Sequence, residues 1–340
     1  MRINHTDVRT QSVFTSTIIA FTITSLVVVG GFFLYKHEKE TIIIDRHNEL
    51  SAIAQLKVKQ LVDWHRERIS EALFFSQNTP YKNYVQGAID GNDAQKALLK
   101  ASLEHIMTNN RYENIFLILE NGQLLFSMDE DFVFLDSTTI GYSKQVFSTG
   151  QIFKSEIYYC KAHDAIHYEI LAPVSVGQKT IAVMVFRIDP SDFLYPLIEK
   201  WPTPSKTAET LLVRRDGDSV TFINQLRHIK NESLTFKLPI TQSKVSAVAA
   251  VNGHTGIFEG VDYRGEKVLS DISKIANTNW YLISEVDQDE FYAEFNQRVI
   301  LIAIIVTIAI LLVVVAMAWM HNYRQRNIYK ELYEKRAELH

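Results

Sequence analysis

The chain has 340 residues, of which 47% are hydrophobic and 22% charged, and its formal net charge is −4. This composition provides no basic field, so it gives no reason to expect nucleic acid as a partner. The single cysteine, Cys160, excludes an internal disulfide, and we expect it to be a buried or half-buried thiol in a domain that depends on its hydrophobic core.

Two long apolar runs lie near the ends of the chain, at residues 13–35 and 299–320. A helix of about 22 residues reaches about 33 Å, which is enough to cross a hydrocarbon core of roughly 30 Å. The first run is too long for a signal peptide, and no Ala-x-Ala cleavage site follows it. The sequence therefore predicts two transmembrane helices, with the first as an uncleaved anchor.

The orientation of the two spans follows from the positive charges outside them. These charges are Arg2 and Arg9 before the first span, and Arg324, Arg326, Lys330, Lys335 and Arg336 after the second. We therefore predict a two-pass protein of the inner (cell) membrane. Its termini, 1–12 and 321–340, are expected in the cytoplasm, and 36–298 in the periplasm or outside the cell.

The region after the first span reads as helical. Residues 36–77 contain no Pro or Gly and end at Asn78-Thr79-Pro80, and two shorter helices are expected at 81–89 and 94–107. The long helix carries one stripe with a spacing of three or four residues: Leu50, Ala54, Val58, Leu61, His65, Ile69 and Leu73. Such a stripe packs either on the domain or on a second copy, and the second alternative predicts a parallel homodimer.

From residue 114 onward the pattern changes to short strands and turns. The turns Asn121-Gly122 and Asp216-Gly217 each join two strand-like segments, and each unit closes with a further hairpin. The distance from Gly122 to Asp189 is 67 residues and that from Gly217 to Asp287 is 70 residues. This periodicity predicts two copies of one α+β unit.

The sequence thus divides into seven parts. The parts are a cytoplasmic N-terminus at 1–12, transmembrane helix 1 at 13–35, a stalk and helical segment at 36–110, a membrane-distal module with a linker helix at 111–200, a membrane-proximal module at 201–298, transmembrane helix 2 at 299–320, and a cytoplasmic signalling helix at 321–340.

A stalk helix, tandem hairpin-rich units and spans at both ends resemble the double Cache (PAS-like) sensor domain of bacterial receptors. The stretch DFLYPLIEKWPTPSKTAETLLVRRDGDSVTFINQLRH, residues 192–228, is similar to that domain in sensor histidine kinases and PAS-containing diguanylate cyclases. The resemblance implies an α+β fold, a small-molecule ligand and a cytoplasmic signalling partner. Because 321–340 is too short for a kinase or cyclase, we expect the output on another protein or in a longer form of the chain.

No catalytic signature occurs in the sequence: GxxxxGK[ST], GxSxG, HExxH, CxxC and the EF-hand loop are all missing. We therefore assign no catalytic residue and no cofactor, and whether the protein is an enzyme stays open. His163 and His167 have a spacing known from zinc sites, but they lie at a loop-to-strand transition with no evident third ligand, so we expect no metal.

The candidate ligand-binding residues form an aromatic and ionisable cluster in the first unit: Tyr158, Tyr159, His163, His167, Tyr168, Arg187 and Asp189. Tyr and Arg suit a small polar or anionic ligand, because they combine ring faces with fixed donors. Strand alternation puts His167 and Glu169 on one face and Tyr168 on the other, so not all of them can face the ligand. The alternative is that the Tyr residues are core and the charged residues are surface.

The resemblance bears on Asp189 in particular. Amino-acid-sensing members place a ligand-binding Asp at the end of this strand, but their upstream Arg-x-Trp-Tyr run is missing here. The second unit shows no comparable cluster, and the pattern near Asp271 and Lys274 indicates a solvated face.

Three functions follow as hypotheses. The first is a transmembrane receptor for a small extracytoplasmic ligand. The second is a membrane-tethered protein-interaction module, which an exposed apolar patch would favour. The third is an exported enzyme on a PAS-like scaffold, which a cluster of titratable groups around a cavity would favour.

Overall fold

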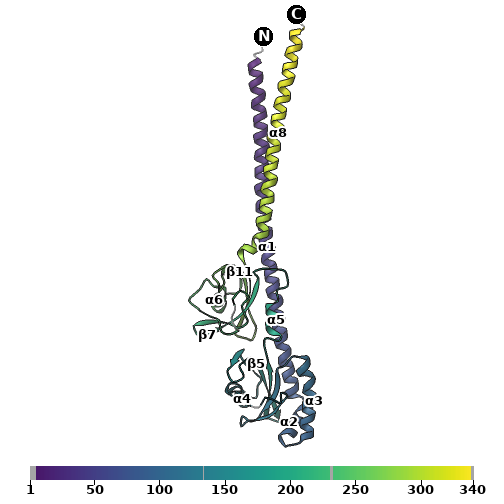
Figure 1. Ribbon diagram of the computed structural model, residues 1–340, viewed down its shortest axis with the longest axis vertical. Helices are drawn as coiled ribbons and strands as arrows, with labels where there is room; N and C mark the ends of the chain where they lie inside the picture. The colour runs from purple at the N-terminus through teal and green to yellow at the C-terminus, as the bar shows by residue number, and fades with distance from the viewer. Residues whose placement is uncertain (1–4, 133, 230–232, 338–340) are drawn as a thin grey trace. The chain divides into compact units, whose positions relative to one another are not determined.

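The structure is a computed structural model that describes residues 5–132, 134–229 and 233–337 (Figure 1). It separates into two compact units. One comprises the terminal segments, Met1–Asn48 and Asp289–His340, and the other is Glu49–Gln288.

The terminal unit is built on two long helices, α1 (His5–Gln77) and α8 (Ala293–Ala337). Their segments Thr17–Gln77 and Phe295–Asn327 are long and apolar enough to cross a membrane. The most apolar windows of these segments are almost entirely unburied in the protein. That exposure suits lipid contact and is unlike a core helix of a soluble protein.

Inside this unit the two helices approach closely at Gly31. A Cβ atom at that position would lie 2.6 Å from Cγ2 of Val306, so only glycine fits the contact without a shift. Further along, the rings of Tyr35 and Phe295 lie 5.7 Å apart, and Arg298 forms an ion pair of 3.0 Å with Glu38.

The unit Glu49–Gln288 begins with helices. After α1 ends at Gln77, α2 (Thr79–Ile89) starts with proline in its first turn, and α3 (Asp93–Asn109) is capped by Asn92, whose side chain accepts a hydrogen bond of 3.2 Å from the Gln95 amide. The break predicted at Asn78-Thr79-Pro80 is therefore confirmed, because proline suits the first turn of a helix and not its interior.

The first sheet is antiparallel and has the order β2-β1-β6-β5-β3, with β4 paired to β5. Its strands are β1 (Asn114–Ile118), β2 (Leu124–Ser127), β3 (Phe153–Lys154), β4 (Tyr158–Cys160), β5 (Ala165–Val176) and β6 (Lys179–Ile188). Helix α4 (Ser137–Thr149) packs on one face of this sheet. We call residues 111–200 the first module.

The second sheet has the order β10-β11-β12-β7-β8-β9. Its strands are β7 (Glu209–Asp216), β8 (Ser219–Phe222), β9 (Lys237–Pro239), β10 (Gly256–Val261), β11 (Lys267–Lys274) and β12 (Trp280–Asp287). Helix α5 (Leu194–Glu199) precedes this sheet, α6 (Ser246–Val251) packs on it, and α7 (Gln288–Phe291) follows it. We call residues 201–288 the second module.

The two sheets repeat one topology. The order β8-β7-β12-β11-β10 in the second module matches β2-β1-β6-β5-β3 in the first. The tandem α+β unit predicted from the sequence is therefore confirmed. Arg187 on β6 faces Asn114 on β1, and Glu285 on β12 faces Glu209 on β7, so Arg187 and Glu285 hold corresponding positions.

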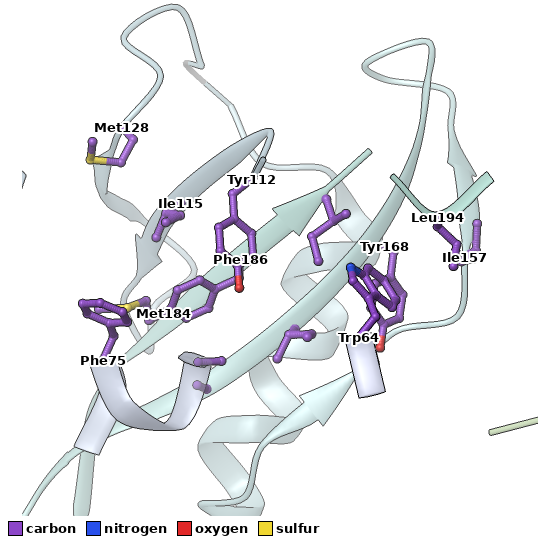
Figure 2. Packing of buried hydrophobic residues seen from close by; sticks show 14 of the residues in the cluster. Trp64, Phe75, Tyr112, Ile115, Met128, Ile157, Tyr168, Met184, Phe186 and Leu194 are labelled. Carbon is purple, nitrogen blue, oxygen red and sulfur yellow. The ribbon is translucent and has the colours of Figure 1, made fainter. Parts of the chain in front are cut away.

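The larger core lies between α1–α3 and one face of the first sheet. Trp64 and Phe75 of α1 pack there with alternate residues of β5 and β6, among them Tyr168, Met184 and Phe186 (Figure 2). This packing decides which alternative holds for the stripe on α1: Leu50, Ala54 and Leu61 are almost completely buried inside a single chain. In the described chain these side chains pack on their own domain, as the first alternative expects, and the parallel homodimer stays a prediction.

Candidate functional site

A buried network of charges lies on the face of the first sheet that is covered by α4. Glu169 on β5 stands opposite Arg187 on β6. The guanidinium of Arg187 lies 2.7 Å from Glu169 Oε1 and 3.1 Å from Asp136 Oδ2. All three side chains are at most 6% exposed. The cationic Arg187 therefore pairs with two acidic side chains away from solvent.

Helix α4 brings two of these polar side chains to the sheet. Asp136 is the N-cap of the helix and accepts hydrogen bonds of 2.9 Å from the amides of Thr138 and Thr139. The Thr139 hydroxyl lies within 3.2 Å of Asp136, Glu169, Arg187 and the Tyr158 hydroxyl. One hydroxyl therefore links the helix, the β4–β5 hairpin and β6.

The environment shifts the pKa values of these carboxyl groups in opposite directions. Burial works against ionisation of Asp136, but hydrogen bonds from Thr139 and the charge of Arg187 outweigh burial and lower its pKa. At Glu169 burial dominates over Arg187 and Thr139, and it raises the pKa of that carboxyl. Uncompensated charges at this depth are costly, so the contacts of Arg187 with both carboxyl groups hold the cluster together.

Aromatic rings close the site. The guanidinium carbon of Arg187 lies 5.1 Å from the ring centre of Phe116 and 5.0 Å from that of Phe132. His163 stacks on Phe134, with ring centres 5.1 Å apart. The segment between β2 and α4 thus covers the charged network with rings.

Four of the seven sequence-predicted residues meet on this face: Tyr158, His163, His167 and Arg187. Tyr158 pairs directly with His167 across the β4–β5 hairpin. His163 Nδ1 lies 3.4 Å from Arg187 Nη1, and the rings of His163 and His167 are 5.5 Å apart.

The other three residues lie elsewhere. Tyr168 points to the opposite face of the sheet, where its hydroxyl lies 2.7 Å from His65 Nε2. Tyr159 is 49% exposed, with its hydroxyl hydrogen-bonded to Asp164. Asp189 accepts a hydrogen bond of 2.8 Å from the Ser191 amide and starts the turn before α5. The alternation expected along β5 therefore holds for His167, Tyr168 and Glu169.

Sequence reasoning missed Asp136, Thr139 and Phe132. The run Asp136-Ser137-Thr138-Thr139 is a recognisable helix start. It carries no signal, however, that this helix end faces Arg187, which is 51 residues further along the chain.

A cavity of about 440 Å³ lies on the other side of β5, away from Arg187. It is lined by His65, Lys154, Ser155, Glu156, Tyr168 and the segment from Lys274 to Trp280. Its walls include a surface turn, and the three charged groups that converge on each other at Arg187 are not among them. We therefore take the Arg187 network as the candidate site, because its buried polar groups converge on one point and could fix the orientation of a ligand.

The second module contains a buried cluster that the sequence did not reveal. Glu209, Asp262 and Glu285 bring carboxylate oxygens within 4.8 Å of one another, and all three are at most 4% exposed. Glu285 Oε2 accepts hydrogen bonds from Ser246 at 2.7 Å and Ser270 at 3.2 Å. Burial raises the pKa of Glu285 to about 8.

One expectation for the second module is therefore wrong, and a second is wrong in part. It does hold a cluster of titratable groups, although Glu285 takes the position of Arg187 and the cation of the cluster is Arg264, which pairs with Asp262. The expectation of a solvated face is wrong for Asp271, which is 7% exposed and accepts a hydrogen bond of 2.5 Å from Ser51 on α1, and it holds for Lys274, which is exposed.

No protein-family model and no curated protein matches the chain. Solved structures do match. The ligand-binding domain of the Pseudomonas fluorescens chemoreceptor CtaA, in complex with L-leucine, has a TM-score of 0.51 and 16% identity, and the match covers 74% of this chain and 99% of that one. The corresponding domain of the Campylobacter jejuni chemoreceptor Tlp3, in complex with 4-methylisoleucine, has a TM-score of 0.54 and 14% identity. The match covers 74% of this chain and 94% of that one.

The ligand-binding domain of the Pseudomonas aeruginosa PAO1 chemoreceptor PctB, in complex with L-Gln, has a TM-score of 0.51 and 16% identity, covering 73% of this chain and 93% of that one. These are double Cache sensor domains. At such identities the likeness shows the fold, and the double Cache fold expected from the sequence is confirmed.

Proposed function

We propose that the chain is a two-pass membrane receptor whose first module binds a small extracytoplasmic molecule at the Arg187 network. The observation that carries the proposal is the buried cluster of Arg187, Glu169 and Asp136 on one sheet face of a double Cache fold. Among the seven sequence candidates, Tyr158, His163, His167 and Arg187 belong to this site.

The charges of the network favour a small carboxylate ligand that also carries an amino group. Arg187 offers planar donors to a carboxylate, and Asp136 with Glu169 offers acceptors to an ammonium group. In the described structure Arg187 pairs with both carboxyl groups. A zwitterion can replace each internal contact with one of its own, and amino acids are the ligands named for the neighbours CtaA, PctB and Tlp3.

The remaining parts of the proposal concern topology and output. We propose that 13–35 and 299–320 span the inner membrane, that 36–298 lies outside the cytoplasm, and that 321–340 passes the signal to an output such as a histidine kinase or a diguanylate cyclase. The boundaries 36–110, 111–200 and 201–298 remain our assignment of the stalk, the membrane-distal sensing module and the membrane-proximal module. The terminal residues 338–340 lie outside the described structure.

The test is ligand-induced stabilisation of the full-length chain in detergent. The panel contains the proteinogenic amino acids, their N-acetyl derivatives and simple dicarboxylates. A ligand at about one hundred times its Kd should stabilise the folded state by about 2.7 kcal/mol. For a unit of this size that corresponds to a rise in Tm of roughly 5–10 °C.

Two substitutions address the site and one serves as its control. Arg187→Lys keeps the charge but loses the planar donors, and Thr139→Val removes the linking hydroxyl. Both should abolish the shift produced by a hit, whereas Thr149→Val at the exposed end of α4 should leave it unchanged. A hit whose effect survives both site substitutions in folded protein would place the ligand elsewhere. An equal shift with its N-acetyl derivative would argue against ammonium recognition.

A further inference from the structure

The hairpin formed by β4 and β5 brings three metal-ligating side chains together. Cys160 pairs with Ala165 and Tyr158 with His167. Because side chains alternate along a strand, Cys160 shares a face with Tyr158, and therefore with His167. The turn between the strands contains Asp164 in a left-handed conformation, with φ of 53°.

That turn returns His163 to the same face. Its Nδ1 lies 3.2 Å from Cys160 Sγ, and the ligand atoms of Cys160, His163 and His167 all lie within 4.8 Å of one another. Zinc bonds of about 2.0–2.3 Å to nitrogen and sulfur fit a set of ligands this close after small side-chain movements. The sequence showed no third metal ligand beside His163 and His167. The structure brings Cys160, the chain's single cysteine, to that position.

Ring nitrogens in this group lack partners. His167 is fully buried and His163 is half-buried, and Nε2 of each ring is buried with no hydrogen-bond partner among the described residues. Buried polar atoms are nearly always paired. Each ring therefore keeps one buried nitrogen without a partner, and this points to a ligand.

The position of Glu113 next to His167 also favours a metal site. Its Oε2 lies 2.9 Å from His167 Nδ1, which leaves Nε2 as the free ligand atom. A carboxylate that accepts from the second ring nitrogen is the usual arrangement behind a metal-binding histidine, since it fixes the orientation and the tautomer of the ring.

The surrounding charge can accommodate a cation. The guanidinium of Arg187 is close to His163 and opposes a metal ion. Three carboxyl groups stand nearby, however: Glu113 beside His167, Asp136 at 4.0 Å from His163 Nδ1, and Glu169 on Arg187 itself.

We infer that Cys160, His163 and His167 form a binding site for a zinc-type transition-metal ion in the first module, with Glu113 as the positioning residue behind His167. One thiolate and two imidazoles suit Zn²⁺, and a fourth position stays open to water or to a ligand group. The inference deepens the proposed function, because the metal becomes a ligand of the same module. Its binding is measurable without any signalling output.

Cobalt titration tests the site directly. The full-length chain, without a histidine tag, is reduced, stripped with a chelator and titrated with Co²⁺ in detergent. A thiolate-to-cobalt charge-transfer band with tetrahedral visible absorption should saturate at one Co²⁺ per chain and disappear when Zn²⁺ is added. Absence of this band in the reduced wild type overturns the inference.

Substitutions test whether the band arises from these residues. Cys160→Ser should abolish the charge-transfer band, and Glu113→Gln should weaken metal binding about 10–100-fold, as is usual for a partner of a liganding histidine. The exposed residues Glu120 and His105 provide the controls Glu120→Gln and His105→Gln, which should leave both measurements unchanged. If Cys160→Ser fails to fold, Glu113→Gln still decides the matter, because unchanged metal affinity in that variant overturns the site.

The two proposals fail separately. Metal binding in the wild type with no stabilising carboxylate would leave the metal site standing and remove the zwitterion site. A carboxylate hit that depends on Arg187, together with no cobalt band, would leave the zwitterion site standing and remove the metal site.

Discussion

Glu169 and Arg187 face each other across β5 and β6, and their side chains meet at 2.7 Å in a region closed to solvent. The second module repeats this strand pair, but there Ser270 faces Glu285. One topology therefore carries a cation in its first copy and a carboxyl group in its second. This difference is a physical reason for expecting the two modules to act differently.

Breaking the Glu169–Arg187 pair should strongly destabilise the protein. Arg187→Met leaves two buried carboxyl groups without their cation, and losing one partner of a buried pair costs about 3–5 kcal/mol. The double variant Glu169→Met with Arg187→Met should recover part of that loss, because it also removes one of the stranded acids. Urea unfolding of the three proteins measures the effect. A double variant no more stable than the single one would argue against coupling of the pair.

The stability of the second module should fall as the pH rises from about 4.5 to about 8. Burial raises the pKa of Glu285 to about 8 from a usual value of 4.5, so the unfolded chain releases this proton in that window while the folded chain keeps it. Folding is therefore increasingly disfavoured as the pH rises.

Glu285→Gln should flatten this pH dependence and raise Tm at pH 8. The exposed Glu259→Gln on β10 is the matched control and should change neither. The measurement is Tm of the full chain across pH 4–9. A wild-type slope that Glu285→Gln leaves intact would assign the effect to another group.

The proposed topology predicts opposite accessibility for the middle and the end of the chain. Gln178 in the turn between β5 and β6, and Asn327 near the end of α8, are both exposed. Gln178→Cys should react with an impermeant maleimide on intact spheroplasts, whereas Asn327→Cys should react only after permeabilisation. Both are made in a Cys160→Ala background. Equal labelling of the two would exclude the two-pass arrangement with cytoplasmic ends.

The predicted homodimer, if formed along α1, must use its outer face. Leu56 and Phe74 are 48% and 54% exposed. They lie 18 residues apart, which is five helical turns, so they share one side of the helix. Cysteines at these positions should crosslink between chains, and cysteine at buried Ala54 should not. Efficient crosslinking at Ala54 instead would show that α1 leaves its own domain in the dimer.

The sequence alone determined the local features of this protein. The apolar runs marked two helices able to cross a membrane, proline at position 80 marked the helix break, and the paired glycine turns marked a repeated hairpin unit. Each of these depends on residues close together in the chain, where propensity, turn geometry and apolar length act directly. The strand period likewise separated His167 and Glu169 from Tyr168, because alternation along a strand requires no tertiary contact.

Only the tertiary structure decided which residues pack against the faces of these helices and strands. Asp136 and Thr139 reach Arg187 because α4 packs over the sheet, and the stripe containing Leu61 is buried because the domain folds onto α1. The same holds for Cys160, which becomes a neighbour of His163 and His167 through hairpin register and turn conformation. A pattern of spacing fixes the direction of a side chain relative to its own element. Its partners depend on packing between elements that are distant in the chain, and that packing is not encoded in any short segment.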